Sequence, residues 1–243
     1  MTLQKSSLVI AICSAMLAVA ACQPAAESEV DANTNAPATE TAIPVETTEP
    51  TADPHTGHDM SAMASGDNEV EQAYMAGMTK MHDDMMAGMQ VNDADVAFAK
   101  GMLPHHEGAV DMAKVQLKYG KDETMRQLAK EIIAAQEAEI AQMQQWLTEH
   151  PDTEKQDNTA EMQQAYEQSM QAMHDDMMAG IKASDPDMAF AKGMLPHHQG
   201  AIAMAEVQLK YGKDEAMRKL AEDIIAAQKV EIATMESWIA DHS

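Results

Sequence analysis

Cysteine is nearly absent from this chain. Only Cys13 and Cys22 occur among its 243 residues, and both lie near the N-terminus. The remaining chain has no thiol, which excludes a disulfide framework, a cysteine nucleophile and thiolate metal ligands there. A soft metal ion bound by the body of the protein must therefore be held by methionine or histidine.

Aromatic residues are also scarce, with 2 Phe, 2 Trp and 4 Tyr against 24 Met. Residues that favour strands become rare after about position 70, whereas Ala, Met, Gln, Glu and Lys, which propagate helices, dominate. The body is therefore predicted to be all-α.

Positive charge is limited, because 16 Lys and Arg face 40 Asp and Glu, giving a net charge of −24 with neutral histidines. Such a chain repels phosphate groups, so no nucleic-acid partner is expected. Acidity of this kind is typical of a soluble surface, and it supports cation binding only weakly.

A long apolar run occurs only at the N-terminus. Residues 1–22 carry Lys5, then an apolar stretch from Leu8, then Ala20 and Ala21 before Cys22. These are the three parts of a secretory signal, and the run is too short to span a bilayer. The small residues before Cys22 resemble a bacterial lipobox, which implies a lipid anchor on Cys22 and a periplasmic protein, held by preference at the outer membrane. An ordinary signal peptide with a cysteine at its cleavage site is the alternative.

Residues 23–68 are rich in Pro, Thr, Ala and Glu without apolar periodicity, which predicts a disordered tether. A compact group of potential ligands lies near its end, at His55, His58, Met60 and Met63. A flexible segment could wrap a metal ion with these side chains, although chance could also supply the cluster. We regard them as weaker metal candidates.

Beyond the tether the chain repeats itself at an offset of 92 residues. Residues 98–120 match residues 190–212 at 19 of 23 positions, and the offset also pairs Trp146 with Trp238 and His150 with His242. This is a tandem duplication, with repeats expected at residues 69–151 and 160–243. Such similarity can reflect recent duplication, so it shows architecture rather than importance.

Each repeat is predicted to contain three helices. In the first copy we expect them at residues 74–90, from Asp93 to Tyr119, and from Asp122 to Glu149, with Gly120 as a C-terminal cap. In the second copy Asp185 followed by Pro186 marks the same helix start. The short turn after Tyr119 makes the second and third helices an antiparallel hairpin. Two such hairpins predict a ferritin-like four-helix bundle, each hairpin being preceded by a shorter, Met-rich helix.

The first helix of each repeat carries a stripe of thioether side chains. At 100° per residue, Met75, Met78, Met81, His82, Met85 and Met89 are expected on one face. Methionine stripes often serve only as packing, but an imidazole among them suits a soft metal. The metal-ligand candidates here are Met78, Met81, His82, Met85 and Met86, with Met170, Met173, His174, Met177 and Met178 in the second copy.

The second helix carries the most specific motif, Gly-Met-Leu-Pro-His-His, at residues 101–106 and again at 193–198. Pro104 removes a hydrogen bond to the carbonyl of Lys100, so the helix is expected to kink or restart there. The histidines could merely cap the kink. Because methionines flank them, we favour binding of Cu(I), or of Ag(I) by the same soft-ligand chemistry. The candidates are Met102, His105, His106 and Met112, with Met194, His197, His198 and Met204.

The third helix is expected to be a core helix, with Met125 and Met143 as plain packing residues. Gln136 and Glu139 lie on or beside its apolar stripe, so they could orient a ligand imidazole, or they could be solvated at its edge.

An oxygen-activating di-iron centre is not expected. Such helical enzymes use Glu-x-x-His pairs, and no Glu lies three residues before any His in this chain. Phosphate-binding loops and Ser-His-Asp arrangements are also missing. We therefore expect no enzymatic activity. A cuprous or other metal-dependent oxidase, and a structural or interaction lipoprotein without metal, are the two alternatives.

These motifs resemble the domain of unknown function 305 family. Residues 98–113 and 190–205 both fit its pattern Phe-x-x-x-Met-x-Pro-His-His-x-Gly-Ala-x-x-Met-Ala, and residues 129–147 fit its later pattern throughout. In residues 221–239 only the final Leu differs, being Ile239.

The resemblance implies a ferritin-like helical fold, an extracytoplasmic location, and copper or silver binding through Met and His in copper tolerance. Its ligand residues would be those of the Pro-His-His motif and its flanking methionines. A copper-transfer protein is a further expected partner.

Overall fold

The computed structural model describes residues 69–243. The predicted signal, the lipidation candidate Cys22, the tether, and His55, His58, Met60 and Met63 lie outside these residues. Every regular element among them is a helix: α1 (Glu69–Met89), α2 (Ala94–Tyr119), α3 (Glu123–Glu149), α4 (Thr159–Gly180), α5 (Pro186–Tyr211) and α6 (Glu215–His242). The all-α prediction is confirmed. None of these six helices has the length and apolar character needed to cross a membrane.

Four of the helices begin at aspartate caps. Asp93, Asp122, Asp185 and Asp214 each accept a hydrogen bond from a backbone amide in the first turn of the following helix, at 2.9–3.2 Å. Each carboxylate satisfies an amide that has no partner inside its own helix, which is why the helices begin where they do. The predicted starts at Asp93, Asp122 and Asp185 are thus confirmed. Helix α1 begins five residues before the predicted Tyr74, and Val70 in this added segment is buried.

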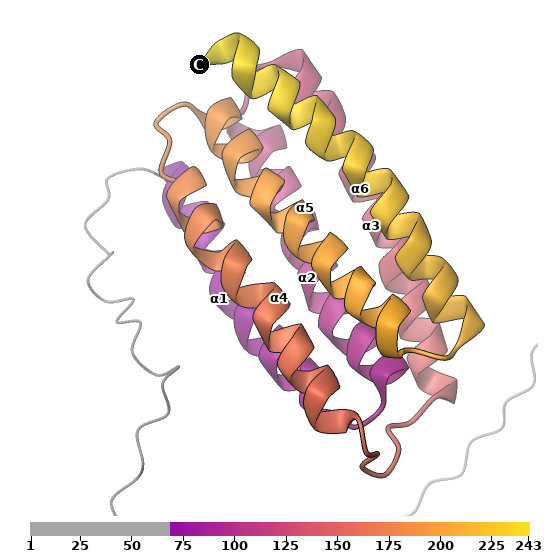
Figure 1. Ribbon diagram of the computed structural model, residues 1–243. Helices are drawn as coiled ribbons and strands as arrows, with labels where there is room; N and C mark the ends of the chain where they lie inside the picture. The colour runs from indigo at the N-terminus through magenta and orange to yellow at the C-terminus, as the bar shows by residue number, and fades with distance from the viewer. Residues whose placement is uncertain (1–68) are drawn as a thin grey trace, which may run out of the picture. The chain divides into compact units, whose positions relative to one another are not determined.

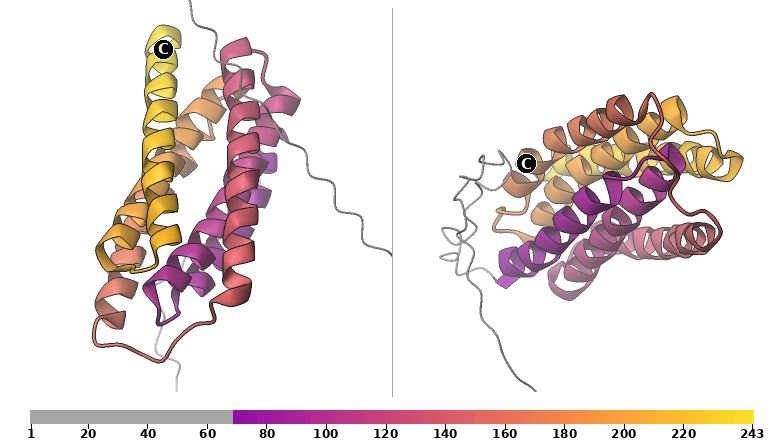
Figure 2. Two further views of the ribbon diagram at one scale, coloured as in Figure 1. Left: turned by 90° about the vertical axis from the view of Figure 1, so that its right-hand side faces the viewer. Right: turned by 90° about the horizontal axis from the view of Figure 1, so that it is seen from below.

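Six helices form two layers of three. In the first repeat α2 packs between α1 and α3, and in the second α5 packs between α4 and α6. The layers meet mainly through α2 and α5, as the end-on view in Figure 2 and the side view in Figure 1 show. The hairpins α2–α3 and α5–α6 form the predicted four-helix arrangement, and α1 and α4 extend it on one side. The two copies therefore share one body.

Helices α2 and α5 cross antiparallel along a seam with a repeated set of contacts. At its centre the rings of His105 and His197 lie 3.8 Å apart, centroid to centroid. On one side the methyl group of Met112 reaches Gly193, and on the other the methyl group of Met204 reaches Gly101, each 3.1–3.2 Å from where a Cβ would stand. The same contacts occur on both sides of the centre, so the seam has an approximate twofold axis.

A buried carboxylate closes each end of the seam. Asp187 on α5 accepts hydrogen bonds from the Gln116 side chain and the Lys121 backbone amide of the first repeat. Asp95 on α2 accepts the equivalent bonds from Gln208 and the Lys213 amide. Buried polar groups such as these cost free energy unless they are paired, so they select this one register of the two helices.

Gly120 is the C-terminal cap of α2, as predicted, and its amide donates to the Gln116 carbonyl; the glutamine side chain in this clamp explains why the cap is a glycine. Gly120, after α2, has φ −70° and ψ 152°, which is extended backbone and not the left-handed cap conformation. A Cβ at this position would instead collide with the side chain of Gln116. Gly120 thus provides space for the inter-repeat hydrogen bond, not a special backbone geometry.

Of the two outcomes expected at Pro104, a kink or a restart, the restart is excluded, because α2 runs without interruption from Ala94 to Tyr119. Pro104 nevertheless leaves the carbonyl of Lys100 without its usual helical donor. Gly88 of α1 lies against this carbonyl, so closely that a Cβ at position 88 would collide with it. Glycine is needed here because the two backbones touch.

Two glycines of α1 should therefore respond oppositely to alanine. Gly88→Ala places its Cβ against the Lys100 carbonyl and should lower the free energy of unfolding by about 1–3 kcal/mol. Gly77→Ala is the matched control, since its Cβ would meet the Asp111 Cβ at an ordinary 3.6 Å. Because alanine favours helix, this variant should gain up to about 1 kcal/mol. Urea unfolding followed by circular dichroism measures both, and equal effects would contradict the close backbone contact.

Candidate metal site

Four buried imidazoles meet at the centre of the α2–α5 seam. His105 and His106 come from the first repeat and His197 and His198 from the second, and all four are fully buried. We call them the histidine quartet. His105 and His197 are the inner pair, 3.8 Å apart between ring centroids, and each outer ring lies 6.3 Å from the inner ring of its own helix. The structure thus brings together two motifs that are 92 residues apart.

A carboxylate from the neighbouring helix holds each outer histidine. Glu139 on α3 lies 2.7 Å from Nε2 of His106, and Glu231 on α6 lies 2.6 Å from Nε2 of His198. An ionised carboxylate can only accept, so Nε2 carries the proton and the lone pair of a neutral ring is on Nδ1. The sequence left two possibilities for Glu139, orienting an imidazole or lying solvated at the edge of the stripe. The structure shows the contact with an imidazole.

The inner histidines have no such partner. Neither ring nitrogen of His105 or His197 makes a hydrogen bond, and the Nδ1 atoms of His106 and His198 are likewise unpaired. Burial, and then the positive charge that neighbouring histidines would carry, holds the pKa of His105 well below its ordinary value, and the same causes act on His197. The inner rings are therefore neutral near pH 7. Buried imidazole lone pairs without partners are the groups that a bound metal ion would satisfy.

Buried methionine side chains lie along the same seam. Met102 and Met194, three residues before the inner histidines, are fully buried. Met112 and Met204 cross to the opposite helix and rest where Gly193 and Gly101 leave room, one helical turn before the inner histidine of that helix. All four predicted methionines of this motif are thus buried at or beside the quartet.

The methionine stripe of α1 and α4 faces inward, as expected. Met81 and Met173 press their sulfur atoms against Gly108 and Gly200, two residues beyond the outer histidines. The other candidates of the stripe are buried too, except Met86, which is half-buried. These residues are Met78, Met85, Met170, Met177 and Met178.

His82 does not lie on this stripe, and the sequence-based placement of it there was wrong. The ring is exposed, because α1 packs through Met78, Met81 and Met85 and the next residue after Met81 turns about 100° away. His174 is half-buried, and its ring centroid lies 5.7 Å from that of His82. The first helices therefore bring their two histidines to each other at the surface, away from the quartet.

The third-helix residues separate into packing and positioning roles. Met125, Met143, Met217 and Met235 are fully buried core residues, as predicted. Gln136 is also buried, but its side-chain nitrogen and oxygen have no hydrogen-bond partner. Only Glu139 of the two expected positioning residues contacts an imidazole.

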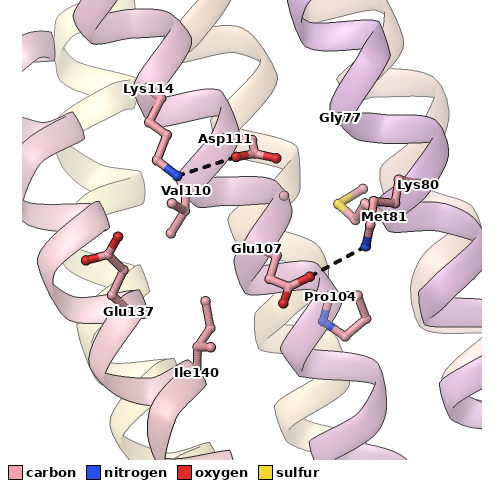
Figure 3. A pocket seen from close by; sticks show the side chains of 11 residues that line it. Gly77, Lys80, Met81, Pro104, Glu107, Val110, Asp111, Lys114, Glu137 and Ile140 are labelled. Atoms are coloured by element: carbon pink, nitrogen blue, oxygen red, sulfur yellow. Dashed lines mark ion pairs between the residues drawn. The ribbon is translucent and has the colours of Figure 1, made fainter. Parts of the chain in front are cut away.

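One hollow of the first repeat does not open onto the quartet. It is an open groove of about 310 Å³ between α1, α2 and α3, and Pro104, Met81 and several charged side chains line it (Figure 3). Lys80 pairs with Glu107 at 3.8 Å and Lys114 with Asp111 at 3.7 Å across its walls. No histidine of the quartet lines it.

Histidine and carboxylate alone do not complete a metal site. Within residues 69–243, no three side chains of His, Cys, Asp or Glu converge closely enough to hold an ion. Ligation at the quartet would therefore combine imidazole with thioether sulfur. That donor set suits Cu(I) and Ag(I) and is unsuited to hard ions such as Mg²⁺ or Ca²⁺.

Comparison with known proteins gives a family and structural neighbours. The family model described as "Domain of unknown function (DUF305)" matches residues 18–147 and again residues 95–239. A DUF305 fragment from Deinococcus radiodurans is 27% identical, with 62% of this chain and 98% of that chain covered and a TM-score of 0.48. CopM in its Cu(I)-bound form is 30% identical, over 60% and 96% of the two chains, with a TM-score of 0.46. No curated protein matches the chain.

Acid should destabilise the metal-free protein through the inner histidines. Their pKa is lowered in the folded state, so below the ordinary value of 6.5 the unfolded chain binds more protons than the folded one. The free energy of unfolding should then fall as pH drops below 6.5, by up to about 1.4 kcal/mol per pH unit for each histidine. Urea unfolding in EDTA between pH 5 and 7 measures this. His105→Gln/His197→Gln should flatten the slope, and a slope unchanged in that variant would contradict the assignment.

Proposed function

The chain belongs to the DUF305 family, and we propose that it is a lipoprotein of the extracytoplasmic space that binds Cu(I), or Ag(I), and sequesters it or hands it on in copper tolerance. Copper is cargo here, not a resident cofactor of an enzyme. The observation that carries the proposal is the histidine quartet, in which six buried ring nitrogens lack hydrogen-bond partners beside buried methionines.

The donor chemistry supports a soft monovalent ion. Neutral imidazole and thioether carry no charge, so they pair well with a monovalent cation that is easily desolvated and poorly with ions that demand several carboxylates. Met102, Met112, Met194 and Met204 are buried on the helices that carry the quartet and would supply the sulfur ligands, and no cysteine follows Cys22 to replace them. Methionine and histidine also resist the disulfide chemistry that removes thiolates in an oxidising compartment.

Glu139 and Glu231 would act as positioning residues. By accepting a hydrogen bond from Nε2, they would fix the orientation of the outer rings and leave Nδ1 of His106 and His198, buried and without a hydrogen-bond partner, as the nitrogen available to an ion. The inner rings, which lack a partner on either nitrogen, can use whichever nitrogen faces the ion.

Location and anchoring rest on the N-terminal sequence. The signal-like residues 1–22 and the lipobox-like Ala20-Ala21-Cys22 support export to the periplasm and a lipid on Cys22, with the outer membrane as the preferred address. Residues 23–68 would then connect the anchor to the helical body. A copper-transfer protein is the partner that we propose for delivery.

Two other functions remain as alternatives. A structural or interaction lipoprotein would use the quartet and the methionines only as core, but unpaired buried imidazoles serve packing poorly compared with leucine. A cuprous or other metal-dependent oxidase would need turnover with oxygen in addition to binding. We propose binding without catalysis, because the donors around the quartet are soft and neutral.

Cu(I) binding should depend on the inner histidines. Anaerobic titration of the full chain against a chromogenic Cu(I) chelator should show at least one tightly held ion, and His105→Gln/His197→Gln should weaken it at least about tenfold. Circular dichroism checks that the variant folds. Fewer than one bound ion, or equal affinity in the folded variant, would favour the interaction lipoprotein.

The positioning carboxylates should tune the same affinity. Glu139→Gln combined with Glu231→Gln removes the acceptor that fixes the outer imidazoles, and we expect Cu(I) affinity to drop about 10–100-fold with the fold retained. Glu137→Gln, an exposed carboxylate on the same helix, is the matched control and should leave affinity unchanged. Nitrogen-15 spectra of the histidines should show loss of the fixed Nε2–H form in the double variant only. An unaltered tautomer would refute the positioning role.

A further inference from the structure

The groove between α1, α2 and α3 contains the differences between two nearly identical segments, and we call it the first-repeat groove. Residues 98–120 and 190–212 differ at only four of 23 positions. These positions have the i, i+3, i+4, i+7 spacing of one helix face. All four line the groove (Figure 3), and they are Glu107, Val110, Asp111 and Lys114. The second repeat instead has Gln199, Ile202, Ala203 and Glu206.

Exposure to solvent does not account for these four differences. Lys100 and Lys118 are exposed on the same helix outside the groove, and the second repeat keeps both, as Lys192 and Lys210. Val110, by contrast, is buried and differs. The differences follow the groove and not the exposed surface of α2, which indicates that the first-repeat groove has a role that the second repeat does not share.

The groove has an apolar floor along α2. Its apolar side chains come from Met81, Pro104, Val110 and Ile140. Figure 3 shows Val110 and Ile140 between α2 and α3, with charged side chains around them. The lining of α2 runs from Pro104 to Lys114, which is about 15 Å, or three helical turns, at a rise of about 1.5 Å per residue. Apolar grooves of this kind accept the apolar face of one amphipathic helix.

The two lysines of the groove already have carboxylate partners. Lys80 pairs with Asp84 at 2.5 Å and with Glu107 at 3.8 Å. Lys114 pairs with Asp111 at 3.7 Å. Because these carboxylates offset both positive charges, an anionic partner would have to displace them.

The remaining charge of the groove is negative. Glu137 on α3 adds a third carboxylate to the lining, and it forms no ion pair within residues 69–243. The second repeat has no carboxylate at the positions of Glu107, Asp111 and Glu137, and Lys229 occupies the last of them. A positively charged partner is therefore attracted to the first-repeat groove more than to the equivalent surface of the second repeat.

We propose that the first-repeat groove is the docking site for a basic amphipathic helix of a partner protein. The apolar face of that helix would rest on the groove floor, and its Lys or Arg side chains would pair with the three groove carboxylates. The site uses no histidine of the quartet, so it goes beyond the proposed metal binding and does not depend on it. The two repeats thus share the α2–α5 seam, and one of them has a separate recognition surface.

The test gives the first-repeat groove the residues of the second repeat. The probe is a fluorescent synthetic helix of about 18 residues, five turns, with Leu on one face and Lys on the other. Fluorescence anisotropy with the full chain at physiological salt should show saturable binding at one site per chain. Binding should weaken at least about tenfold in the groove variant, which combines Glu107→Gln, Val110→Ile, Asp111→Ala, Lys114→Glu and Glu137→Lys.

A charge-matched variant separates docking from general attraction to an acidic protein. The net charge of the groove variant rises by two, since Glu107 and Asp111 become neutral while Lys114 and Glu137 exchange signs. Glu236→Lys, at an exposed position of α6, raises it equally and should keep the affinity of the unaltered chain. Circular dichroism checks that both variants fold. A peptide of the same composition without the amphipathic pattern should bind at least about tenfold more weakly.

Several results would overturn the proposal. They are the absence of saturable binding, equal affinity in the folded groove variant, an equal loss in Glu236→Lys, and equal binding of the peptide without the pattern. Sedimentation of the protein alone tests another occupant, because a dimer that the groove variant abolishes would assign the groove to a second copy of this chain. Cu(I) titration of the groove variant should give the affinity of the unaltered chain, so this test is independent of the metal proposal.

Discussion

The antiparallel contact of α2 with α5 is the constraint on which the rest of this structure depends. It joins the two repeats, centres the four histidines and sets the register through the buried carboxylates Asp95 and Asp187. Close approach is possible because Gly101 and Gly193 leave room for methionines from the opposite helix. A shift of one helical turn would break both carboxylate clamps at once, and buried polar groups without partners would make that register costly.

The quartet does not improve stability. Each buried polar group without a partner costs about 1–3 kcal/mol, and leucines would fill the same volume without that cost. The lowered pKa of His105 and His197, caused chiefly by burial, adds an acid-dependent penalty. Helical proteins tolerate such groups where they serve binding, and the compensation here comes from the well-packed methionine and alanine core around them.

Duplication brings together side chains that one repeat alone could not pair. Both histidine pairs across the repeats, His105 with His197 and His82 with His174, lie on the approximate twofold axis between matching helices. A residue that lies near a twofold axis is next to the equivalent residue of the other repeat. One histidine in each repeat therefore gives a pair of histidines. The two pairs differ in burial, because His105 and His197 are fully buried whereas His82 is exposed and His174 half-buried.

Much of this could be predicted from residues alone, because helix caps, helical periodicity and the hairpin turn depend on neighbours along the chain. Asp93, Asp122 and Asp185 gave the helix starts, and the methionine stripe gave the buried face of α1. Other features depend on which helix packs where, and no local pattern encodes that. His82 lies outside the buried face because α1 buries only a narrow stripe, and Gly120 leaves space for a Gln116 side chain that binds across the repeats. The motif at 101–106 shows from the sequence alone that two histidines are adjacent. Only the tertiary structure shows that they lie against a second pair 92 residues away, because packing between the repeats creates that contact.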